Sequence, residues 1–305
     1  LSAVVTSGQP NPLGGAFASL SDPVLLGRRR MVFAGATDGV FVRDGTAIRA
    51  VAVSGDATPA GGTFQSFTRA KVNASGAVAF RARLDGARGE SGIFYWDEHE
   101  ILPVVVDGDP APGEGVLGSS PKFALNARGE IAFATRDGLF LWSASSGVTR
   151  LVRAGSSLGD PSPCPGGSPI RRILSLAMND RGDVVFHTST PQSDAVLMWS
   201  GGGLTKIACE SDPDGSVHPL RGTELALNNA GLTVFKGRVS AFSRGYFAKT
   251  PEGAPTVIVR DGDPAPGGGV FLLFFPGGSG VPAVNDAGDV AVSVTVLVDS
   301  ELPGA

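Results

Sequence analysis

A unit of about 50 residues recurs along this chain, and no other feature of the sequence restricts its fold as much. The clearest part of the unit is the motif Asn-x-x-Gly-x-x-Ala-Phe. Its five copies begin at Asn73, Asn126, Asn179, Asn228 and Asn285, with spacings of 53, 53, 49 and 57 residues. A degenerate sixth copy ends at Phe33. Such a period indicates a repeat architecture, in which each unit buries its apolar face against the next one.

A second block, rich in Gly, Asp and Pro, recurs at the same period. Its six copies begin at Ser7, Ser54, Asp107, Gly159, Ser211 and Asp261. The copies Asp107–Gly113 and Asp261–Gly267 are identical in sequence, and those at Gly159 and Ser211 are the loosest. A short aromatic run, such as Phe94–Trp96, lies between the Asn motif and this block.

The sequence pattern of each unit predicts four short strands. They are the apolar stretch before the Asn, the Val-Ala-Phe run after the Gly, the aromatic run, and the β-branched run before the Gly-Asp block. The Asn-x-x-Gly tetrapeptide suits a tight turn in which Asn caps its own backbone and Gly takes a positive φ. Four short strands in about 50 residues match one blade of a β-propeller.

We therefore predict an all-β fold, a six-bladed β-propeller forming a single domain over residues 1–305. The repeat units are expected near residues 7–53, 54–106, 107–153, 154–207, 208–260 and 261–305. Residues 1–6 contain a strand that lacks its own blade, and we expect it to pair with the C-terminal blade and close the ring. The third strand of that last blade is not evident before Ala305.

Composition excludes several classes of protein. The 44 Gly and 22 Pro follow no three-residue period, which excludes collagen and leaves little room for long helices. The net charge of -4 offers no basic surface for a nucleic acid. The sequence has no run of 18 apolar residues, so we expect no membrane-spanning segment. Because the chain begins at Leu1 without a signal segment, we expect a processed chain or a fragment.

The five Asn-x-x-Gly-x-x-Ala-Phe copies, together with the Gly-Asp-Pro-Ala-Pro-Gly block, resemble the bacterial tandem-repeat family named NxxGxxAF. They are more distantly similar to the repeats of Tol-B-like propellers. The resemblance covers nearly the whole chain. It implies export and a role in the periplasm or at the cell surface, and it implies no established reaction. Members of the family carry varied C-terminal anchors, whereas Ser300–Ala305 contains no hydrophobic anchor.

The two cysteines, Cys164 and Cys209, have no CxxC spacing and are too few for a zinc cluster. They lie 45 residues apart, near the same position of two consecutive repeats. The spacing is compatible with a disulfide bond across two blades and equally with two inert thiols. The sequence leaves both alternatives open.

The aspartates of the Gly-Asp-Pro blocks are the candidate ligand-binding residues. Chain direction predicts that these loops share one face near the propeller axis, and His218 is expected to join them. The candidate residues are Asp56, Asp109, Asp160, Asp212, Asp263 and His218. A ring of carboxylates can bind a cation or a polyhydroxylated ligand. The alternative is structural, because Asp before Pro in a Gly-rich loop commonly caps a turn.

No nucleophile elbow, phosphate loop or metalloprotease helix occurs, so catalytic residues are unknown and no cofactor or metal site is expected. His187 is not repeated in the other units, and we assign it to the surface or to packing. We predict an exported, noncatalytic monomer that binds a protein or a carbohydrate. The alternative is a hydrolase or lyase acting on a carbohydrate-like ligand at the channel mouth. An asymmetric cluster of polar residues at that mouth would distinguish the two.

Overall fold

The computed structural model describes residues 5–20, 23–26, 30–35, 38–118, 122–156, 164, 170–189, 194–212, 216–239, 243–273 and 280–298. Twenty-five β-strands and no helix occur in this part of the chain. The chain divides into two compact units, Leu1–Arg150 and Leu151–Ala305, and each is described by itself. Among the residues that the structure describes, no long apolar helix of the kind that spans a bilayer is present.

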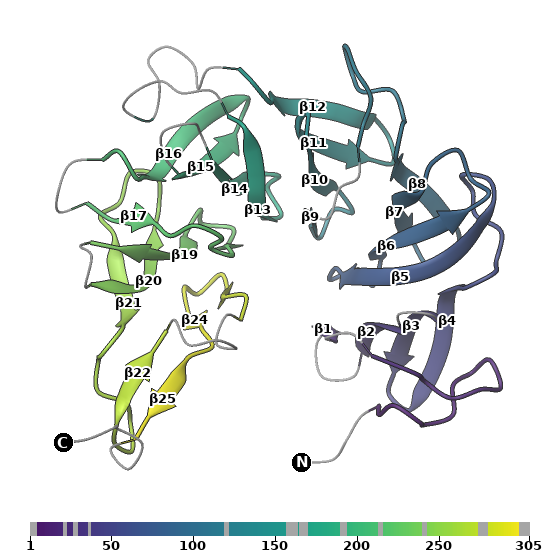
Figure 1. Cartoon of the computed structure of the whole chain (residues 1–305), viewed down its shortest axis with the longest axis horizontal. Coiled ribbons are helices and arrows are strands. Elements are labelled where there is room, and N and C mark those ends of the chain that lie inside the picture. Colours follow the sequence, from purple (N-terminus) through teal and green to yellow (C-terminus); the bar gives the residue numbers. More distant parts are fainter. Residues whose placement is uncertain are drawn as a thin grey trace. The chain divides into compact units, whose positions relative to one another are not determined.

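Three antiparallel sheets begin in the first unit, each with its four strands in chain order (Figure 1). The first contains β1 (Val24–Leu26), β2 (Arg30–Gly35), β3 (Gly39–Asp44) and β4 (Ala47–Val53). The second contains β5 (Thr63–Val72), β6 (Val78–Asp85), β7 (Ser91–Trp96) and β8 (Ile101–Val106). The third contains β9 (Lys122–Leu125), β10 (Ile131–Thr135), β11 (Gly138–Ser143) and β12 (Gly147–Arg153), the last of which crosses the division between the units.

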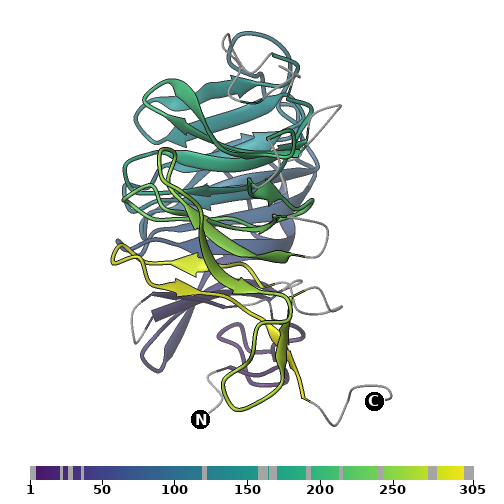
Figure 2. The same cartoon turned by 90° about the vertical axis from the view of Figure 1, so that its left-hand side faces the viewer.

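The second unit holds two larger sheets and two short ladders. The first sheet contains β13 (Arg172–Met178), β14 (Val184–Ser189), β15 (Asp194–Ser200) and β16 (Gly203–Cys209). In the next, β17 (His218–Pro219) and β18 (Ala226–Leu227) both pair with β19 (Thr233–Arg238), followed by β20 (Arg244–Lys249) and β21 (Thr256–Arg260). Two-stranded ladders join β22 (Val270–Leu272) to β25 (Thr295–Leu297) and β23 (Ala283–Val284) to β24 (Val290–Ala291), drawn in yellow-green and yellow in Figure 2.

Aromatic residues of the repeat meet across neighbouring strands in four of the five larger sheets. There the Phe that ends the Asn motif lies directly opposite a Phe of the next strand, as in Phe80 with Phe94 and Phe133 with Phe140. The rings of these two pairs stack with centroids 5.7 and 5.4 Å apart. In the β13–β16 sheet, by contrast, Phe186 lies opposite Leu197. The apolar clusters combine side chains of two consecutive sheets, so the core lies between sheets, as in stacked β-architectures.

The Asn-x-x-Gly turns have the predicted conformation. In all five copies the Gly N–H donates to the Asn carbonyl, at 3.0 to 3.1 Å, and the Gly has a φ between 78° and 90°. The Asn Oδ1 accepts the backbone N–H of the residue four positions later, at 2.8 to 3.0 Å. Both the Asn cap and the positive φ of the Gly are confirmed.

The all-β class and the four-stranded sheets are confirmed, whereas the blade count of six stays a prediction. Strands of the sixth repeat form only the two short ladders in the described part of the chain. The N-terminal strand that was expected to complete this repeat falls largely on residues 1–4, which lie outside the described residues. The Cys164–Cys209 disulfide is present, with the two Cα atoms 5.9 Å apart.

Candidate binding site at the asparagine turns

Three consecutive Asn turns of the second unit surround a polar pocket of about 330 Å³. Each turn contributes the last residue of the strand before it and the first two residues of the Asn motif. The lining residues are Met178, Asn179, Asp180, Leu227, Asn228, Asn229, Val284, Asn285 and Asp286. The strands that position them are β13, β18 and β23, the first strands of their repeats.

In two of these three turns, the first asparagine also links its turn to the next one. Asn179 Nδ2 donates to the backbone carbonyl of Asn228 at 3.1 Å, and Asn228 Nδ2 donates to that of Asn285 at 3.0 Å. The first unit repeats this bond, from Asn73 Nδ2 to the carbonyl of Asn126 at 2.9 Å. Asn179 and Asn228 are both about 4% exposed, so these amides form the floor of the pocket.

Asp183 supports the first of these amides. Its carboxylate accepts hydrogen bonds from Asn179 Nδ2 at 2.8 Å and from Ser200 Oγ at 2.5 Å, and Arg181 pairs with it at 2.9 Å. Burial alone raises the pKa of Asp183, but these three donors outweigh burial and hold its pKa below the ordinary value. The carboxylate is therefore ionised at neutral pH and fixes the orientation of the Asn179 amide.

The second residues of the three turns form a charged bridge at the pocket rim. Asn229 Nδ2 donates to Asp180 Oδ2 at 3.1 Å and to Asp286 Oδ2 at 2.9 Å. In return, Asn229 Oδ1 accepts the N–H of Asp180 at 2.8 Å, and Asp286 Oδ1 accepts the N–H of Asn229 at 2.9 Å. One amide thus holds two carboxylates in place without neutralising them.

The turn itself does not require these polar residues. Ala74 and Ala127 occupy the same position in the copies that begin at Asn73 and Asn126, which form the same turn. Carboxylates occupy it only in the copies that begin at Asn179 and Asn285, on either side of Asn229. Sequence reasoning missed this difference because it followed the constant residues of the motif. The signal was the change from Ala to Asp or Asn at a variable position.

The predicted ligand-binding aspartates mostly bind their own loops. Asp109, Asp212 and Asp263 each accept the backbone N–H of the residue three positions earlier, at 2.8, 3.0 and 2.7 Å. Asp109 also pairs with Arg88 at 2.7 Å, and Asp212 with Lys206 at 2.6 Å. These are the contacts of a turn cap, and the ligand-binding role of the three aspartates stays a prediction.

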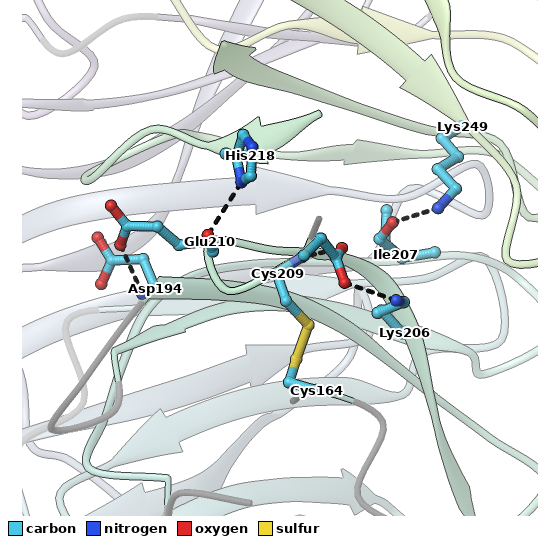
Figure 3. The surroundings of a disulfide bond; sticks show 9 residues. Cys164, Asp194, Lys206, Ile207, Cys209, Glu210, His218 and Lys249 are labelled. Atoms are coloured by element: carbon cyan, nitrogen blue, oxygen red, sulfur yellow. Dashed lines mark hydrogen bonds and ion pairs between the residues drawn. A yellow bond between two sulfur atoms is a disulfide. The ribbon is translucent and has the colours of Figure 1, made fainter. Parts of the chain in front are cut away.

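The other predicted site residues do not line the pocket at the Asn turns. Asp56 is exposed in the loop after β4, and Asp160 lies outside the described residues. His218 is buried on β17, where its Nδ1 lies 3.0 Å from the carbonyl oxygen of Glu210 (Figure 3). In the described part of the chain, no group of three or more His, Cys, Asp or Glu side chains is placed to hold a metal ion.

A family model covers almost the whole chain. The model of DUF7453, a family of unknown function, matches residues 1–302. The chain belongs to DUF7453. A search of curated proteins finds no match for this DUF7453 chain. The comparisons do not show the NxxGxxAF family that the motif resembles.

Several solved structures are similar to this DUF7453 chain at low identity. A putative TolB from Agrobacterium tumefaciens is 12% identical, with a TM-score of 0.47, over 80% of this chain and 82% of that one. The extracellular domain of a putative hybrid two-component system from B. thetaiotaomicron is 11% identical, with a TM-score of 0.43, over 93% of this chain. The DUF7453 chain spans only 34% of that domain's length. Regucalcin from A. tumefaciens, a calcium-binding protein, is 10% identical, with a TM-score of 0.39, over 71% of this chain and 67% of that one.

Proposed function

We propose that this protein is an exported, noncatalytic six-bladed β-propeller that binds a carbohydrate or a protein segment through the pocket at the Asn turns. The observation that carries the proposal is the Asp180–Asn229–Asp286 bridge. It occupies a position where the same turn forms equally well with Ala74 or Ala127. A residue type that the fold does not require, and that gathers around a pocket, is expected at a binding surface.

The chemistry of the pocket favours binding over catalysis. Its polar lining consists of three backbone-linked amides and the bridge, and its nine residues include no nucleophile paired with a base. Carboxylates only accept hydrogen bonds when ionised, so the rim suits a ligand rich in donors, such as the hydroxyl groups of a sugar. The enzyme alternative at a channel mouth stays a prediction, and no described contact favours it.

Export is supported by the disulfide between Cys164 and Cys209, because such bonds seldom persist in a reducing cytosol. The NxxGxxAF resemblance agrees with export. The six-bladed closure extends the pattern of the four four-stranded sheets and the five-stranded sheet to the sixth repeat. The Gly-Asp-Pro loops, with Asp56 exposed on one of them, remain a second predicted ligand surface.

A glycan array and a surface-protein pull-down with matched variants test this proposal. The Asp180→Asn/Asp286→Asn variant removes two carboxylates at nearly constant side-chain volume, and we expect it to reduce binding at least tenfold. The control Glu100→Gln/Glu252→Gln removes two exposed carboxylates elsewhere and should bind like the wild type. Asp56→Asn tests the second surface. Equal binding by the first variant and the control, with loss in Asp56→Asn, would move the site to the Gly-Asp-Pro loops.

A further inference from the structure

His187 is a buried titratable side chain that does not line the binding pocket. It lies on β14 with no exposed surface, and neither ring nitrogen has a hydrogen-bond partner in the structure. Most buried polar groups are hydrogen-bonded, because leaving one unpaired costs free energy. Packing alone therefore does not explain why an imidazole without hydrogen-bond partners is buried at this position.

The imidazole faces the seam between the sheet β13–β16 and the sheet of β17–β21. Side chains two residues apart on a strand share a face, so His187 lies on the side of Val185, which packs against Val217 and Leu225 of the next repeat. The segment that carries these two residues, Ser216–Leu225, includes β17, which contacts β15 and β16. This segment is hereafter called the seam segment.

Two described side-chain contacts join the seam segment to the β13–β16 sheet and the residue after it. Ser175 Oγ of β13 donates to the carbonyl of Thr223 at 2.6 Å. His218 Nδ1 lies 3.0 Å from the carbonyl oxygen of Glu210, the residue that follows β16 (Figure 3). Within its own sheet the segment is held by β19: β17 pairs with Gly237 and Arg238, Leu220 N–H donates to the Lys236 carbonyl at 3.0 Å, and Lys236 N–H donates to Thr223 Oγ1 at 2.7 Å. Toward the β13–β16 sheet, the rest of the described attachment is apolar contact in the cluster that contains Val217 and Leu225.

Three charged groups act on the imidazole: Asp194 of β15, Glu210 just after β16 and Arg221 of the seam segment. Asp194 at the start of β15 places Oδ2 3.9 Å from His187 Nε2, too far for a hydrogen bond. Glu210 attracts a proton to the ring, whereas Arg221 of the seam segment repels one. The Glu210 carboxylate is already engaged by the N–H of Asp194 and by Arg238, at 3.1 and 3.2 Å.

We propose that the seam segment is an acid-operated latch, which stays closed over neutral His187 and opens when the imidazole takes up a proton. A protonated ring has two N–H donors that the closed seam does not satisfy, beside the positive charge of Arg221. Opening gives both donors access to water. Asp194 Oδ2 is too far from Nε2 to accept a hydrogen bond in the closed state, and burial, followed by the neighbouring Glu210, raises the pKa of Asp194, which weakens its hold on a charged ring as the pH falls.

The direction and size of the effect follow from linkage. Burial, followed by Arg221, lowers the pKa of His187 from 6.5 to about 4 in the closed state. The closed state is therefore fully favoured above pH 6.5 and loses stability progressively as the pH falls toward 4. With these two values, opening is about 30-fold more favourable at pH 5 than at pH 7.5.

The other repeats provide internal controls. Positions equivalent to His187 are Arg81, Ala134 and Lys236, none of which has an ordinary pKa between 4 and 7. The seam between the β5–β8 and β9–β12 sheets, where Ile131 and Phe133 pack, should not respond to acid in this range.

Hydrogen exchange of the intact protein, corrected for the intrinsic effect of pH, tests the latch. Between pH 7.5 and 5.0 we expect opening of residues 216–225 to increase about 30-fold in the wild type and by less than threefold in His187→Leu. The seam around Ile131 should be unchanged in both proteins. NMR titration of wild-type His187 needs no variant and should give a pKa well below 6.5. A pKa of 6.5 or above, or the same acid response in His187→Leu, would overturn the proposal.

Discussion

Three asparagines of the repeated turn, Asn73, Asn179 and Asn228, each use one amide group for two purposes. The amide oxygen caps the turn that the Asn begins, and the nitrogen donates to the carbonyl of the corresponding Asn in the next repeat. Asp or Ser can also cap such a turn, whereas the second contact requires an amide, and all five turns of this chain begin with Asn.

Replacing Asn228 by Asp separates these two purposes. The carboxylate retains the cap to Leu232, but the donor to Asn285 is lost and a negative charge faces a carbonyl. We expect a loss of about 1 to 3 kcal/mol in the free energy of unfolding. Asn11→Asp is the control, because the described contacts of the Asn11 side chain are the caps that Oδ1 makes to the N–H groups of Leu13 and Gly15. In urea denaturation, this control should lose far less free energy of unfolding than Asn228→Asp.

The turn glycines differ in what surrounds them, although all five have a positive φ. A Cβ at Gly288 would meet no atom within 4 Å, whereas one at Gly129 would lie 2.6 Å from the hydroxyl oxygen of Tyr95. Gly288→Ala should therefore cost about 1 kcal/mol of backbone strain. Gly129→Ala should cost clearly more, because buried Tyr95 must move. Thermal unfolding of both variants gives the comparison, and equal losses would contradict it.

At the scale of elements, the disulfide fastens two segments that no strand pairing joins. Cys209 ends β16, and Cys164 precedes β13, the opposite edge strand of the same sheet. Asp212 holds the end of β16 at the same place, accepting the N–H of Cys209 and pairing with Lys206. The bond thus secures a strand end that is already fixed by local contacts, and it joins that end to Cys164, 45 residues earlier in the chain.

Removing the disulfide should lower the free energy of unfolding substantially. The bond closes a loop of 45 residues, for which the chain-entropy model gives about 4 kcal/mol. The Cys164→Ala/Cys209→Ala variant should show this loss in urea denaturation, and reduction of the wild type should reproduce it. Alkylation of the unreduced protein followed by mass spectrometry should find no labelled cysteine. Two labelled thiols in protein from its native compartment would contradict both the bond and its support for export.

At the scale of the whole molecule, the sixth repeat differs from the others. Its described strands form two ladders of two strands, so β24 and β25 have only one described partner each. Open edges invite unwanted pairing, and propellers normally protect them by completing the last blade. The predicted N-terminal strand is the element that would supply this protection.

Deleting residues 1–6 should therefore destabilise the C-terminal repeat. We expect a lower melting temperature and faster hydrogen exchange in Val290–Leu297, because the closing strand would be missing. Deletion of residues 301–305 removes a similar length of chain and should leave both measurements unchanged. If the two deletions have the same effect, the closure is wrong.

Local features of this protein could be predicted from its sequence. Asn73 to Gly76 specify their turn through hydrogen bonds within five residues, and Phe80 lies on a short apolar run that pairs with the next one along the chain. Such short-range interactions depend on residue type and spacing, so the repeat predicted the four-stranded sheets. The capping alternative for Asp109 could be predicted for the same reason, since its contact to Val106 is local.

Only the tertiary structure decided which distant side chains meet. Asn229 contacts Asp180 and Asp286 across 49 and 57 residues, and the sequence alone does not fix how far successive turns lie from each other. From the sequence, His187 could be assigned either to the surface or to packing. In the structure it is buried, at the face of β14 that packs against the next repeat. The sequence determined the turns and strands because their hydrogen bonds are local. The pocket and the buried imidazole depended on how the sheets stack, which sets distances between residues far apart in the chain.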